Sequence, residues 1–120
     1  EGVADLMKTH SEKIIELDPV YQDGGGYFML GVIHYKSPYI PFLLPWPDND
    51  QALKYLQLAL DTGHATLNQK IYMAKALIKD KQLNKAKKLL LEVISSDPDP
   101  INLVEELDDI EEAHQLLEDF

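Results

Sequence analysis

A stretch of sixteen residues recurs after 34 positions, and this internal repeat limits the possible folds more than any other feature of the chain. Residues 49–64, NDQALKYLQLALDTGH, align without a gap with residues 83–98, LNKAKKLLLEVISSDP. The aligned pairs are Ala52 and Ala86, Leu56 and Leu90, Ala59 and Val93, and His64 and Pro98. Units with this period bury only part of their apolar surface alone, so the pattern predicts helical hairpins that stack on one another.

The repeat resembles the tetratricopeptide repeat (TPR), whose two helices carry small and large apolar residues at fixed places. The matching residues are Met73, Ala74 and Leu77 in the first helix, Ala86, Leu90 and Val93 in the second, and Pro98 at the close. In YFMLGVIHY, Tyr27, Leu30 and Gly31 occupy the aromatic, leucine and glycine places, and His34 stands where tyrosine is common. Lys70, at the early aromatic place of the next repeat, departs from the family pattern.

We therefore expect an all-α fold, a TPR-like α-α superhelix of antiparallel helix hairpins with a C-terminal capping helix. The predicted helices cover residues 3–17, 25–36, 49–61, 67–80, 83–96 and 102–118. The single domain expected over 1–120 comprises the second helix of a truncated repeat (1–19), a repeat with a loop insertion at 37–47 (20–64), a plain repeat (65–98) and the capping helix (99–120).

Local patterns predict further details of the helices. Asp48 with Gln51, and Thr66 with Gln69, are typical helix-start capping pairs. The apolar face predicted for the last helix consists of Leu103, Leu107, Ile110, His114 and Leu117. The glycine-rich DGGG at 23–26 lacks the lysine and serine of a phosphate loop, so we interpret it as a flexible turn at a helix start.

The insertion is SPYIPFLLPWP, residues 37–47, and comparison of the two repeats gives the number of added residues. From Gly31 to Ala52 the chain advances 52 − 31 = 21 residues, whereas from Ala74 to Ala86 it advances 86 − 74 = 12, a difference of nine. Its four prolines exclude a regular helix, and it is too apolar for a disordered linker. We expect Trp46 to anchor the insertion on the repeat core, and residues 39–44 to form a ligand-side wall or a partner surface.

Between residues 20 and 120, the insertion ends within PWPDNDQALKYLQLAL, the plain repeat follows, and the chain closes with SSDPDPINLVEELDDIEEAHQLLEDF. With these motifs, residues 20–120 resemble the TatT-like T component of TRAP transporters, a TPR protein family. The resemblance implies a periplasmic lipoprotein that self-assembles, binds a TRAP substrate-binding protein and offers an apolar cavity to hydrophobic ligands. A lipoprotein needs an N-terminal cysteine, and this sequence contains none. Because it starts at Glu1, we expect a trimmed or processed chain whose lipid anchor would lie in the missing N-terminus.

Charge and composition argue against other classes of protein. The formal net charge is −10, and all eleven basic residues are lysines, which disfavours nucleic-acid binding. No apolar run of 18 residues is present, so we expect no transmembrane segment. Without cysteine and without a serine–histidine pairing, we expect no enzyme and no cofactor. A metal site at Asp108, Asp109, Glu111 and Glu112 is the less favoured alternative to a solvated acidic face that complements the lysine-rich repeat.

The first helices of such repeats line an inner groove, and this groove is the predicted binding site. The candidate ligand- or partner-binding residues are Phe28, Met29, Val32, Tyr35, Tyr39, Phe42, Trp46, Tyr72, Lys75 and Lys79. The same register also places Asn68, Ile71 and Ile78 on this groove. An apolar group with an acidic head would fit such a surface. The alternative is that the apolar residues pack against N-terminal helices that are missing here.

Two functions remain for this chain. The first is a periplasmic TatT-like component that binds a transport partner protein, a hydrophobic or amphipathic ligand and further copies of itself. The second is a generic TPR scaffold that binds a protein or peptide, in the cytoplasm or the periplasm.

Overall fold

A computed structural model describes residues 2–19, 21–37, 46–63 and 65–120, and all regular structure in them is helical. The α-helices are α1 (Val3–Leu17), α2 (Tyr21–Lys36), α3 (Asn49–Leu60), α4 (Leu67–Lys79), α5 (Leu83–Ile94) and α6 (Leu103–Glu118), and a 3-10 turn, η1 (Pro100–Asn102), precedes α6. The predicted all-α fold is thus confirmed for the described residues.

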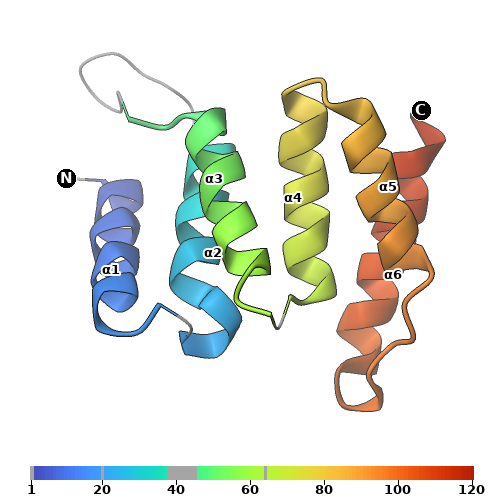
Figure 1. Cartoon of the computed structure of the whole chain (residues 1–120), viewed down its shortest axis with the longest axis horizontal. Coiled ribbons are helices and arrows are strands. Elements are labelled where there is room, and N and C mark those ends of the chain that lie inside the picture. The colour runs from blue at the N-terminus through green and yellow to red at the C-terminus, as the bar shows by residue number, and fades with distance from the viewer. Residues whose placement is uncertain (1, 20, 38–45, 64) are drawn as a thin grey trace. The chain divides into compact units, whose positions relative to one another are not determined.

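The helices form two compact units, residues 1–65 and residues 66–120. In the first unit, α2 packs against both α1 and α3, and the three helices alternate in direction (Figure 1). In the second unit, α4, α5 and α6 pack against one another in all three pairs. The border between the units falls beside the border between the two predicted repeats.

The repeated residues of the sequence occupy equivalent buried places in the two units. Ala52, Leu56 and Ala59 of α3, and Ala86, Leu90 and Val93 of α5, are all fully buried. In the second unit, the apolar core consists of Leu67, Ile71, Ala74, Leu90, Val93 and Ala113. The 34-residue pattern therefore predicts correctly which side chains of α3 and α5 face inward.

The glycines of DGGG lie inside α2, so the predicted helix-start turn is wrong, and the helix begins at Tyr21 rather than at residue 25. Gly26 allows a close approach to α1, because a Cβ there would lie 2.8 Å from Cγ1 of Ile15. Gly24 has φ +79°, a conformation that favours glycine. These glycines are required by packing and backbone conformation, which local turn signals do not reveal.

Helix ends follow the predicted capping chemistry in part. Thr66 and Gln69 form the expected capping box at the start of α4. Asp48 caps α3 through its carboxylate, which accepts the N–H of Asp50. Helix α4 ends in a turn where Lys81 takes φ +63° and Gln82 N–H donates to the carbonyl of Leu77. This arrangement is a Schellman turn formed without glycine.

Helix α6 packs on the core through only part of the face predicted for it, because Ile110 and Leu117 contact the core as predicted. Ala113 is fully buried, and Ile110, Leu116 and Leu117 pack against the same core. Leu103, Leu107 and His114 are exposed, so their predicted place on the packed face is wrong. The small side chain of Ala113 lets α6 approach closely, and this turns the packed face away from the stripe that includes His114.

Candidate interaction surface

Helix α1 has a wide apolar arc, and α2 covers only one part of it. The covered part includes Ser11, which is 1% exposed, and Ile15. On the other part, Val3, Leu6 and Leu17 are 72%, 59% and 73% exposed. Their spacing, with Met7, His10 and Ile14 between them, places them on one side of the helix. Within the described part of the first unit, no helix covers this apolar face of α1.

Two shallow hollows lie along this face, and both combine residues of α1 and α2 or the turn between them. The first has a volume of about 430 Å³ and is lined by Leu6, Met7, His10, Ser11 and Met29. The second has a volume of about 350 Å³ and is lined by His10, Ile14, Leu17, Asp18 and Tyr21. Because His10 lines both, the hollows are neighbours, and together they follow most of the length of α1. Volumes of this size suit a few apolar side chains or a small amphipathic molecule.

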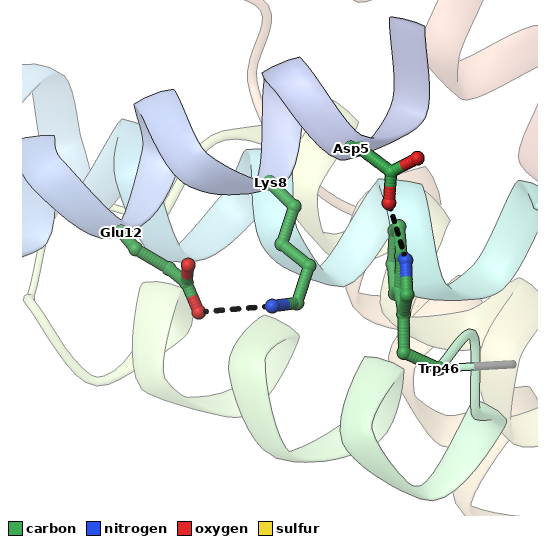
Figure 2. Close-up of polar contacts among 4 residues, drawn as sticks. All are labelled: Asp5, Lys8, Glu12 and Trp46. Atoms are coloured by element: carbon green, nitrogen blue, oxygen red, sulfur yellow. Dashed lines mark hydrogen bonds and ion pairs between the residues drawn. The ribbon is translucent and has the colours of Figure 1, made fainter. Parts of the chain in front are cut away.

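On another side of α1, Trp46 binds the C-terminal end of the insertion to the helix. The indole Nε1–H of Trp46 donates to Oδ1 of Asp5 at 2.8 Å (Figure 2). The Lys8 ammonium lies 5.5 Å from the centre of the indole ring and forms an ion pair with Glu12 at 3.3 Å. Asp5 and Lys8 therefore bind Trp46 through a hydrogen bond and a cation–π contact, each of which contributes about 1 kcal/mol.

His34 of α2 contacts the same segment and is only 6% exposed. Its ring makes an edge contact with Trp46, at a centroid distance of 5.2 Å, and is stacked on Tyr55 of α3 at 5.8 Å. Its Nδ1 accepts the backbone N–H of Asp48 at 3.1 Å. Burial lowers the pKa of His34, and Lys8 lowers it further, while Asp48 and Glu12 oppose this shift. One histidine thus contacts the two residues on either side of Pro47.

The predicted site residues of the first unit fall into four groups. Met29 lines the first hollow, whereas Phe28, Val32 and Tyr35 are half-buried along α2. Trp46 is held by its own chain through α1 and α2, as expected for an anchor. Tyr39 and Phe42 lie outside the described residues.

In the second unit, Lys75 of α4 links the predicted site to α6. Lys75 forms an ion pair with Glu112, and its ammonium lies 4.9 Å from the centre of the Tyr72 ring. Lys79 is exposed at the end of α4. Ile71, which the sequence register places on the groove, is fully buried in the core instead. The ion pair is an example of the expected charge complementarity between the acidic last helix and the lysine-rich repeat.

Asp109, one turn before Glu112 on α6, has a pKa raised to about 6. Burial is the main cause, and the nearby carboxylates of Glu112, Glu106 and Asp108 add to it, while Lys75 acts in the opposite direction. The folded protein therefore binds this proton more tightly than the unfolded chain does. Through this group, the free energy of unfolding falls as pH rises from about 4 to about 6 and is constant above that range.

Replacing Asp109 by asparagine should stabilise the protein at pH 7 by up to about 1 kcal/mol, a value reduced because the carboxylate is partly solvated. The gain should shrink through the window between pH 6 and 4, because the wild-type carboxyl becomes protonated there. Urea unfolding at pH 4.5, 5.5 and 7 measures this dependence. Glu118→Gln removes the same charge from the exposed end of α6 and serves as the control. An equal gain at every pH, or a loss at pH 7, would contradict the expectation.

Sequence reasoning misses most residues of the uncovered apolar face of α1, namely Val3, Leu6, Met7, His10 and Leu17, and it also misses Tyr21 of α2, which lines the second hollow. A signal for the residues of α1 is present in that helix itself. The helix carries apolar residues at 3, 6, 7, 14, 15 and 17, and this arc is wider than one neighbouring helix can bury. If α1 is interpreted as a helix with a single packed face, its second, exposed apolar face is overlooked.

Among residues 2–19, 21–37, 46–63 and 65–120, no three histidine or carboxylate side chains are grouped so that they could hold a metal ion. In the same residues, no helix combines the length and the apolar character needed to cross a membrane. The described surface of the first unit offers apolar contact on α1 and α2, with charged groups beside it.

No protein-family model matches the sequence, and neither a curated protein nor a solved structure matches the chain. The TPR and TatT-like resemblances therefore depend on the residues that carry them in the sequence.

Proposed function

We propose that this protein is a non-enzymatic interaction protein built of TPR-like helical hairpins, and that it binds its partner through the uncovered apolar face of α1. The observation that supports the proposal is the exposure of Val3, Leu6 and Leu17 on a helix whose other side is already packed. Burying each of these side chains against a partner would contribute up to about 1.5–3 kcal/mol. Exposed apolar patches of this kind are typical of protein–protein contact sites.

In its most specific form, the proposal is a periplasmic TatT-like component of a TRAP transporter. Its partner would be the TRAP substrate-binding protein, and the two hollows would accept apolar side chains of that partner or the chain of a fatty acid. The PWP motif and the acidic C-terminal helix support this form through the resemblance alone. The second candidate is a generic TPR scaffold, which the same apolar face of α1 favours without specifying the partner.

The double variant Leu6→Gln, Leu17→Gln tests the surface. If the face binds a TRAP substrate-binding protein, the variant should weaken the complex by about tenfold or more in sedimentation or titration experiments, because two apolar anchors are lost. Val104→Gln, Leu107→Gln is the matched control, since these α6 residues are also exposed, at 70% and 49%, and lie outside the proposed surface. The control should bind as the wild type does.

The outcomes separate the two forms of the proposal. Binding to the substrate-binding protein that only the α1 variant weakens supports the TatT-like function. A complex of the chain with itself, weakened by the same variant, supports a scaffold that self-assembles. Equal binding by both variants, or no association of any kind together with no lauric acid adduct in native mass spectrometry, rejects α1 as the binding surface.

A further inference from the structure

His34 makes its contact to Asp48 with a lone pair. The backbone N–H of Asp48 is the donor, so Nδ1 must be unprotonated and the ring hydrogen must lie on Nε2. This neutral ring joins three parts of the first unit. It belongs to α2, is stacked on Tyr55 of α3, and contacts Trp46, which is itself bound to Asp5 of α1.

Protonation would remove the acceptor. An imidazolium carries N–H on both nitrogens, so the N–H of Asp48 would face a second donor instead of a lone pair. The amide would then be left without its partner in a half-buried position, which is unfavourable. Two donors repel each other at the 3.1 Å that separates the Asp48 nitrogen from Nδ1, so the segment of Trp46, Pro47 and Asp48 would move away from the ring.

The charges around the ring decide how strongly protonation is opposed. From α1 it faces Lys8, which repels an imidazolium, and Glu12, which attracts one but is already paired with Lys8. Asp5 is engaged with the Trp46 indole. From the start of α3, the carboxylate of Asp48 attracts the imidazolium but also caps the helix through Asp50 N–H. Tyr55, whose ring also contacts the Lys54 ammonium, completes the surroundings on α3.

We propose that His34 acts as a proton-operated latch that holds the Trp46–Asp48 segment on the first unit when neutral and releases it when protonated. The latch is independent of the partner proposed above. The neutral ring contributes its stabilisation fully above pH 6.5, and this contribution is lost as pH falls through the lowered pKa of the folded state. The Trp46–Asp48 segment is therefore released under mildly acidic conditions, and the second unit stays unchanged.

Nuclear magnetic resonance of the whole chain between pH 7.5 and 5 tests the latch. Trp46 is the only tryptophan, so its indole N–H gives a unique signal. The His34 ring should titrate with a midpoint below 6.5. The Trp46 indole and the Asp48 amide signals should move with the same midpoint, and the Leu90 amide in the second unit should not. The proposal is overturned if the Trp46 and Asp48 signals stay in place while His34 titrates, or if His34 takes up no proton above pH 5.

His34→Asn supplies the matched variant, because the asparagine carbonyl can accept the Asp48 N–H but takes up no proton in this range. Its Trp46 and Asp48 signals should resemble the neutral wild type at every pH. His34→Gln is a second variant of the same design if asparagine prevents folding. His10→Gln and His114→Gln replace exposed histidines and should keep the acid transition. A transition that persists in both His34 variants contradicts the latch.

Discussion

Leu90→Ala should lower the free energy of unfolding by about 3 kcal/mol, within the range of about 2–5 kcal/mol found for buried leucines. Leu90 is fully buried, and it belongs to a core to which α4, α5 and α6 all contribute. The change removes apolar area and leaves a cavity, because tightly packed neighbours relax only in part. Urea unfolding followed by circular dichroism measures the loss.

The next residue along the chain provides the control. Leu91→Ala makes the same chemical change in the same helix, but Leu91 is 49% exposed. It should cost less than about 1 kcal/mol, since less area is uncovered and no closed cavity forms. If the two variants lose equal stability, the orientation assigned to α5 is wrong. A large loss at Leu91 with a small one at Leu90 would indicate a helix rotated about its axis.

Gly31→Val should destabilise the first unit by about 2 kcal/mol, even though valine favours helix more than glycine does. A Cβ at position 31 would lie 2.6 Å from Cγ of Leu56 and 3.1 Å from its backbone nitrogen. The side chain of Leu56 could shift, but its nitrogen belongs to the backbone of α3. The added methyl groups would therefore push α2 and α3 apart.

Met29→Val introduces the same residue two positions earlier in α2, at a place that is 37% exposed. Comparison by thermal and urea unfolding separates the clash from the helix preference of valine. The control should change stability by about 0.5 kcal/mol. A Gly31→Val variant as stable as the wild type would show that α2 and α3 are not in the close contact described here.

The sequence predicts the helices well because the repeat contains two independent signals. Helical spacing of apolar residues gives the type of element, and the 34-residue period identifies matching positions in α3 and α5. The burial of Leu56 and Leu90 at equivalent places follows from the combination. Thr66 and Gln69 are equally predictable, because a capping box depends only on residues three positions apart.

The remaining features depend on contacts between distant residues. Asp5 and Trp46 are 41 positions apart, and neither residue type indicates the other as its partner. Which face of α6 packs depends on how closely the helix can approach the core at Ala113. Which residues of α1 are buried depends on how much of its apolar arc α2 covers. The close approach at Gly26 requires Ile15, which lies on another helix. Such choices are decided by three-dimensional fit, for which one sequence contains no periodic signal.

The position of Trp46 also allows the two units to be distinguished by spectroscopy. The only tryptophan and its contacts with Asp5 and His34 lie in residues 1–65, while residues 66–120 hold no tryptophan and Tyr72 as their one tyrosine. Indole fluorescence therefore reports unfolding of the first unit, whereas helical circular dichroism reports both. Coincident midpoints of the two signals in urea would mean that the units unfold as one cooperative body. Separate midpoints would give each unit its own stability from a single unlabelled sample.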